Sequence, residues 1–105
     1  MPSARVDEAR ATGEKLARLR VARRLRQSDA AARAGLARST AALIEKGDLG
    51  RTQAQILRYL DAIAPGVSLL SLLQGDDPSL QMLAAREATQ RVRALSKAEL
   101  EKLDF

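Results

Sequence analysis

Two glycines divide the segment from Arg26 to Gly47 into two short helical stretches, and this segment constrains the fold more than any other. It reads RQSDAAARAGLARSTAALIEKG, in which Gly35 fits a left-handed helix stop and Gly47 fits a second one. Residues 27–34 and 38–46 are therefore expected to form helices joined by a tight turn. Two helices of this length linked at a glycine have a helix-turn-helix layout.

The residues on either side of this segment predict further helices and no strand. We expect residues 1–11 to form a flexible arm, with continuation into the first helix as the alternative. The first helix is expected to begin at Thr12 as its N-cap and to end near Arg23. Thr52 is a suitable N-cap for a fourth helix, and Ser68 for a short fifth helix over residues 69–73. The fourth helix carries apolar residues at helical spacing, namely Ile56, Leu57, Leu60 and Ile63.

The tail beyond residue 75 predicts one long helix and one short helix. Asp77 followed by Pro78 is typical of a helix start, and we expect the long helix to reach about Leu95. Ser96 and Glu99 have the spacing of a capping box, which predicts a separate last helix. The expected fold is thus all-α, with a five-helix domain over residues 12–75 and a helical extension over residues 76–105.

The charge of the chain points to a polyanionic partner. The net charge is +5, and the sequence pI is near 10.4, which makes nucleic acid the expected class of partner. Up to Arg51 there are twelve Lys and Arg against six Asp and Glu, whereas the remainder has six against seven. The basic half of the chain is therefore the half that contains the helix-turn-helix.

Composition argues against several other classes of function. The chain has no Cys and no His, so thiol chemistry, most zinc sites and most general-base catalysis near neutral pH are not expected. Asp76 and Asp77 stand beside Pro78, which favours a helix start over a metal site. We therefore expect no enzyme and no cofactor. No apolar run approaches the roughly 20 residues of a membrane span, and the N-terminus lacks the apolar core of a signal peptide, so a cytoplasmic protein is expected.

With these helices assigned, the chain resembles the XRE family, the lambda-repressor-like helix-turn-helix proteins. The resemblance covers about residues 13–73. It is carried by Gly13, Leu16, Leu19, Arg20, Ala22, Leu25, Gln27, Ala31, Gly35-Leu36, Arg38-Ser39-Thr40 and Ile44-Glu45-Lys46-Gly47. The resemblance implies that residues 38–46 form a recognition helix in the major groove of DNA.

The resemblance also implies roles for individual residues. Arg38, Ser39 and Leu43 are the expected readers of base edges, with Arg38 suited to guanine and Leu43 to a thymine methyl group. Gln27 resembles the family's glutamine beside the DNA backbone. The other expected contacts to phosphate are Arg24, Arg26, Thr40, Lys46 and Arg51. A simpler interpretation of Ser39 and Thr40 is that they are only polar residues in the first turn of a helix.

One structural contact is implied by similarity to the phage repressors of the family. Glu45, near the end of the third helix, should form a partly buried ion pair with Arg20 of the first helix. Such a pair would hold the two helices in a fixed orientation, and losing one partner would leave a costly buried charge.

The chain also departs from the family pattern. Arg26 and Ala37 stand where the family usually has Ser or Thr as helix caps, and Arg24 stands where it usually has Gly. Ala30, Ala41 and Gln53 replace larger aliphatic residues. The core is therefore expected to be lightly packed and to depend on the later helices.

These features of the sequence favour two functions. The first is a sequence-specific regulator of transcription, a repressor that binds double-stranded DNA with a palindromic operator as a homodimer. The alternative is an antitoxin that binds its toxin through residues 76–105 and also regulates its own promoter. The long helix and Phe105 equally fit dimerisation or capping of the core, which we favour over toxin binding.

Overall fold

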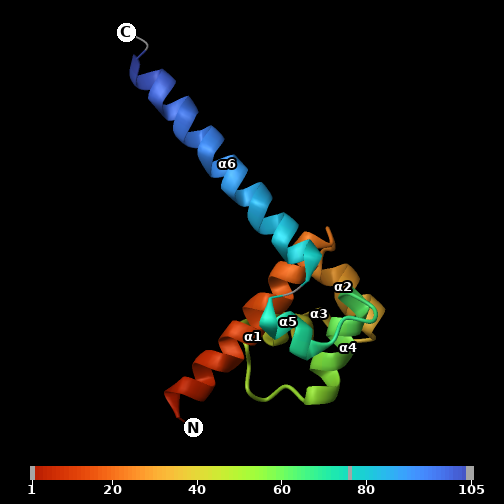
Figure 1. The fold of residues 1–105 in the computed structure, drawn as a ribbon. Coiled ribbons are helices and arrows are strands. Elements are labelled where there is room, and N and C mark those ends of the chain that lie inside the picture. Colours follow the sequence, from red (N-terminus) through yellow and green to blue (C-terminus); the bar gives the residue numbers. More distant parts are fainter. Residues whose placement is uncertain (1, 76, 104–105) are drawn as a thin grey trace.

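The computed structural model describes residues 2–75 and 77–103, with the side chains of the last helix described as far as Val92. Every regular element within these residues is a helix, which confirms the all-α class (Figure 1). The six helices are α1 (Ser3–Ala22), α2 (Gln27–Ala34), α3 (Arg38–Lys46), α4 (Gln53–Ile63), α5 (Leu69–Gln74) and α6 (Pro78–Leu103). The first five helices form a compact body, and α6 projects from it (Figure 1).

The helix boundaries in the middle of the chain follow from local chemistry, as predicted. Gly35 and Gly47 end α2 and α3 in the left-handed conformation, with φ angles of 68° and 77°. Such angles are open to glycine without the steric cost that a Cβ brings. Thr52 caps α4 by accepting from the Gln55 backbone N–H, and the Gln55 side chain completes a capping box. Ser68 caps α5 through the N–H of Ser71.

Two predicted boundaries are corrected. The arm expected over residues 1–11 is helical from Ser3, so Thr12 lies inside α1, where its hydroxyl donates to the Glu8 carbonyl rather than capping a helix. The separate short helix expected from Ser96 does not exist, because α6 continues to Leu103. Neither Gly nor Pro interrupts α6 after Pro78, so nothing in the sequence forces a break near Ser96.

The core lies between the five helices of the body. It is built from buried aliphatic residues and one aromatic residue, Tyr59, which is fully buried in α4. The other buried hydrophobic residues are Leu16, Leu19, Ala30, Ala31, Ala34, Ala41, Ile44, Leu60, Ile63, Ala64 and Leu72. Five of these twelve are alanines, so the helices approach one another closely around the α2–α3 pair.

Small residues also bring α1 against the end of α3. A Cβ placed on Gly13 would lie 2.5 Å from the Glu45 carbonyl oxygen, and one on Gly47 would lie 2.6 Å from the Cα of Arg10. Both distances are too short for any side chain, so the two backbones touch directly. The stretch of α1 over residues 9–13 is thus packed against the body.

The last helix is attached to the body at its N-terminal end. Leu80 packs against the core, and Asp77, the residue before the helix, is buried. Met82 and Val92 are exposed, each at 63%. Phe105, given a role from the sequence, lies outside the described residues. Among the described residues, none of the helices combines the length and the apolar character that crossing a membrane requires.

Candidate nucleic-acid interface

The third helix has one buried face and one exposed face. Ala41 and Ile44 are buried against the body. Arg38 and Ser39, in the first turn, are exposed, while Leu43, one turn further on, is partly exposed. The three side chains predicted to read bases are therefore accessible at or near the N-terminal end of α3. Side chains at positions 39 and 43 also share one helix face, because residues four apart lie above one another.

The loop between α1 and α2 places basic side chains close to the start of α2. Arg24 and Arg26 are exposed, and Gln27 is the first residue of α2. Arg24 has a φ of 58°, in the left-handed region, at the position where the family usually has Gly. A non-glycine residue there costs roughly 1–2 kcal/mol, so the loop retains an arginine against a local preference.

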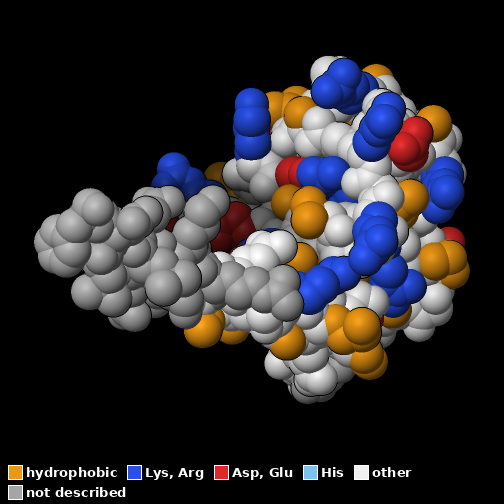
Figure 2. All heavy atoms as spheres, turned by 90° about the horizontal axis from the view of Figure 1, so that it is seen from above, with side chains coloured by type: hydrophobic (Ala, Val, Ile, Leu, Met, Phe, Trp, Pro, Cys, Tyr) orange, Lys and Arg blue, Asp and Glu red, His pale blue; other side chains and the backbone are white. Residues whose placement is uncertain are grey.

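The remaining predicted phosphate contacts lie in the first and last turns of α3 and in the loop that follows it. Lys46 is exposed in the last turn, and Thr40 is partly exposed. Arg51 forms an ion pair with Asp48 at 3.4 Å, so its guanidinium is already engaged within the loop that follows α3. Figure 2 shows Lys and Arg side chains spread over the body, with acidic side chains scattered between them.

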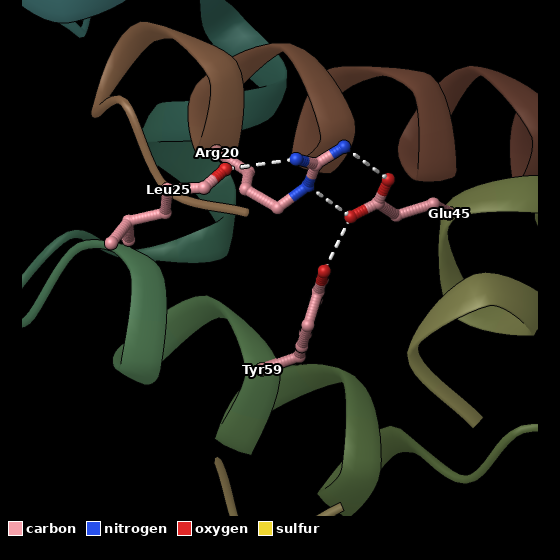
Figure 3. A network of polar contacts seen from close by, with 4 residues as sticks. All are labelled: Arg20, Leu25, Glu45 and Tyr59. Atoms are coloured by element: carbon pink, nitrogen blue, oxygen red, sulfur yellow. Dashed lines mark hydrogen bonds and ion pairs between the residues drawn. The ribbon is translucent and has the colours of Figure 1, made fainter. Parts of the chain in front are cut away.

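A network of polar contacts holds α1, α3 and α4 together (Figure 3). The Arg20 guanidinium donates from Nε to Glu45 Oε2 at 2.7 Å and from Nη2 to Glu45 Oε1 at 3.1 Å. The ion pair implied by the resemblance is thus present, in a bidentate geometry. The Arg20 and Glu45 side chains are only 17% and 8% exposed. Arg20 Nη1 also donates to the Leu25 carbonyl oxygen at 2.9 Å, which ties down the loop before α2.

Tyr59 is the third member of this network. Its hydroxyl donates to Glu45 Oε2 from the core side, so the carboxylate is held between α1 and α4 (Figure 3). Burial raises the pKa of Tyr59 above its usual value, and the hydrogen bond to Glu45 raises it further. The hydrogen bond to Glu45 likewise raises the pKa of Arg20. Both donors therefore keep their protons, and no buried charge is left unpaired.

A second contact from α4 reaches the turn between α2 and α3. Arg58 Nη2 donates to the carbonyl oxygens of Ala34 at 2.7 Å and Gly35 at 3.1 Å. Adjacent residues of α4 therefore contact both halves of the α2–α3 pair, with Arg58 on the turn and Tyr59 on Glu45.

Sequence reasoning did not identify Arg58 or Tyr59. One signal was available for Tyr59, because it is the only Tyr in the chain and lies among apolar residues of a helix. A buried Tyr hydroxyl usually needs a hydrogen-bond partner. No local pattern reports the contact of Arg58, because its acceptors are backbone carbonyls of another helix.

The chain was compared with models of protein families, with curated proteins and with solved structures, and none of them matches it. The exposed N-terminus of α3, with a guanidinium and a hydroxyl, and the exposed arginines of the loop before α2 offer donors to phosphate oxygens and to base edges.

Proposed function

We propose that this protein is a sequence-specific regulator of transcription that binds double-stranded DNA through α3 and the loop before α2. The observation that carries the proposal is the exposed first turn of α3, where Arg38 and Ser39 point away from a face that is packed on the body. A helix can enter the major groove only when its reading face is free in this way.

The proposal gains support from the charge around α3. Arg24, Arg26 and Lys46 are exposed and come from the segments before and at the end of the α2–α3 pair. Contacts to phosphate position a protein on the duplex, while contacts to base edges supply the sequence preference. The basic residues would thus fix the position of α3, and Arg38 and Ser39 would read the bases.

We further infer that α1–α5 have the lambda-repressor-like arrangement. Support comes from the order of the five helices, from the turn at Gly35 and from the Arg20–Glu45 ion pair. In this arrangement α2 lies across the DNA backbone, and Gln27 at its start would donate to a phosphate.

The homodimer, the palindromic operator and the repressor role stay predictions from the resemblance. So does the alternative, an antitoxin that binds a toxin through residues 76–105. A palindrome in the bound DNA would support the dimer, because half-sites about one helical turn apart mirror the two-fold symmetry of the protein.

The experiment that tests the proposal is selection of bound duplexes from a random pool, followed by a salt titration with the selected duplex. We expect a defined sequence to be enriched, and we expect affinity to fall steeply as salt rises, because bound phosphates release counterions. Enrichment of no sequence would contradict base reading. Affinity that is independent of salt would contradict phosphate binding.

Two substitutions separate reading from positioning. Arg38→Ala should relax the preference at one base-pair position, at a cost of about 1–3 kcal/mol. Lys46→Ala should weaken binding to all sequences alike and reduce the slope of log K against log salt by about 1. Arg91→Ala removes an exposed arginine of α6 and serves as the matched control. If Arg38→Ala lowers affinity with an unchanged preference, Arg38 contacts the backbone.

A further inference from the structure

We propose that Arg58 of α4 is a positioning residue, which directs the reading end of α3 by holding the turn between α2 and α3. The inference rests on the proposed function for its consequence on DNA, although the contact itself belongs to the fold. The role of Arg58 would be exerted through Gly35 and the turn.

Backbone hydrogen bonds link the turn to the end of α2. The N–H of Leu36 donates to the Ala31 carbonyl, and the N–H of Gly35 donates to the Ala32 carbonyl. These two bonds form a Schellman motif, which satisfies two carbonyl groups of the last turn of α2. The carbonyl groups of Ala34 and Gly35 lie beyond the reach of this motif.

Arg58 supplies donors for these two carbonyl groups. Its Nη2 lies 2.7 Å from the Ala34 oxygen and 3.1 Å from the Gly35 oxygen. The C-terminal end of a helix carries a partial negative charge, so a guanidinium there is favoured both as a hydrogen-bond donor and as a cation. The turn is thus held by backbone hydrogen bonds to α2 and by the Arg58 side chain of α4.

The start of α3 lacks a side-chain cap, and Leu36 before it packs against the core. Ala37 occupies the N-cap position of α3 and provides no side-chain hydrogen bond. Only Leu36 and Ala37 separate the turn glycine from Arg38. The direction of the first turn of α3, which carries Arg38 and Ser39, therefore depends on the turn as well as on the packing of Leu36.

The space around Gly35 shows how closely Arg58 approaches. A Cβ on Gly35 would lie 2.8 Å from Arg58 Nη2, so a side chain at this position would displace the guanidinium. Gly35→Ala would also impose a strained φ on a non-glycine residue, which confounds its interpretation. Substitutions of Arg58 itself break the contact without that strain.

The test compares Arg58→Gln with Arg33→Gln in the full chain. Arg33 is an exposed arginine of α2, in the last turn before Gly35, so its loss removes the same charge near the same turn. Arg58→Lys is the conservative variant, since its ammonium can still donate to a carbonyl but lacks the fixed geometry of the guanidinium.

The first measurement is amide hydrogen exchange without DNA. In Arg58→Gln, exchange should accelerate about tenfold at Gly35 and Leu36, which corresponds to about 1.4 kcal/mol of lost protection. The amides of Leu60 and Ile63 should keep their protection, and Arg33→Gln should match the parent protein. Unchanged exchange at Gly35 and Leu36 would overturn the proposed hold on the turn.

The second measurement is binding to the selected duplex and to a scrambled duplex of equal length. Arg58→Gln should lose about tenfold for the selected duplex, or about 1.4 kcal/mol, and clearly less for the scrambled one. Arg33→Gln should lose affinity for both alike, and Arg58→Lys should be intermediate. Equal losses for both duplexes in Arg58→Gln would show that Arg58 acts only as a charge, which overturns the positioning role.

The two measurements also separate this inference from the proposed function. A parent protein that binds no duplex DNA would overturn the proposed function and the reading role of α3. The exchange data would then still decide whether Arg58 holds the turn.

Discussion

The ion pair within the body and the ion pair that attaches α6 to the body lie in different surroundings. In the body, the side chains of the Arg20–Glu45 ion pair are only 17% and 8% exposed. The hydroxyl of Tyr59, which is buried in the core, donates a further hydrogen bond to Glu45. Between α6 and α1, the ion pair of Arg18 with Glu87 has side chains 49% and 39% exposed. The two pairs have similarly short contacts, of 2.7 Å and 2.6 Å, yet different surroundings.

This difference decides what each pair contributes to stability. A solvated ion pair gains little over its separated ions, typically about 0–1 kcal/mol, and it weakens as salt rises. A buried pair adds little net stability while intact but is costly to break, because the remaining charge has no partner. Short distance is therefore a poor guide to importance in this protein, and burial is a better one.

The sharpest test of this comparison removes one carboxylate from each pair. Glu45→Ala should lower the free energy of unfolding by about 3–5 kcal/mol, because Arg20 is left charged and largely buried. Glu87→Ala should lower it by no more than about 1 kcal/mol, with the loss shrinking as salt is added. Urea unfolding at two salt concentrations measures both values. Similar losses from the two substitutions would show that burial does not separate the pairs.

Tyr59 extends the comparison to pH. The pKa of Tyr59 is raised in the folded state, chiefly by burial. The pKa of an unfolded tyrosine is about 10. The stability that this proton provides is therefore complete below about pH 10 and is lost as the pH rises above it. Tyr59→Phe should cost about 1–3 kcal/mol at neutral pH, as expected for a hydrogen bond to a charged group.

The measurement is the difference in unfolding free energy between the parent and Tyr59→Phe, followed from about pH 8 to about pH 11. This difference should narrow above about pH 10, because only the parent loses the contribution of Tyr59. Glu87→Ala is the control, since its ion pair with Arg18 does not include Tyr59. A difference from Tyr59→Phe that stays constant across the range would mean that Tyr59 does not titrate as the structure implies.

The sequence predicts the middle of the fold well because local signals decide it. Gly35 and Gly47 end helices through their left-handed conformations, and Thr52 begins one through its side-chain cap, so each boundary depends on nearby residues alone. The Arg20–Glu45 pair came from the resemblance, since no local pattern joins residues so far apart. For the site, the sequence points to exposed Arg38 and Ser39, but the structure alone reveals Arg58 and Tyr59.

The two errors in the predicted boundaries have different physical origins. Residues 3–11 carry no apolar stripe, yet α1 packs through Gly13 and the backbone near Arg10, which a search for large hydrophobic residues overlooks. At Ser96, the capping-box pattern is also compatible with a helix interior, because Ser and Glu are tolerated there at modest cost. A start signal without a preceding stop does not break a helix.

Asp77 provides the smallest and most local test, at the junction of the two regions. Its Oδ1 accepts from the Ser79 backbone N–H as the cap of α6, and its Oδ2 lies 3.4 Å from Arg23 Nη2. Asp77→Ala should cost about 1 kcal/mol from the lost cap. Asp77→Asn keeps a good capping side chain but removes the charge, so it isolates the pair with Arg23.

Because Arg23 is 35% exposed, water can replace the lost partner, and Asp77→Asn should stay close to the parent protein. The readout is amide exchange in the first turns of α6, compared with that of Leu60 in the body. Faster exchange confined to α6 in Asp77→Ala would show that the extension is anchored separately from the core. Equally accelerated amide exchange at Leu60 would instead show that the body and α6 unfold as one unit. The difference between the two regions would then be limited to their individual ion pairs.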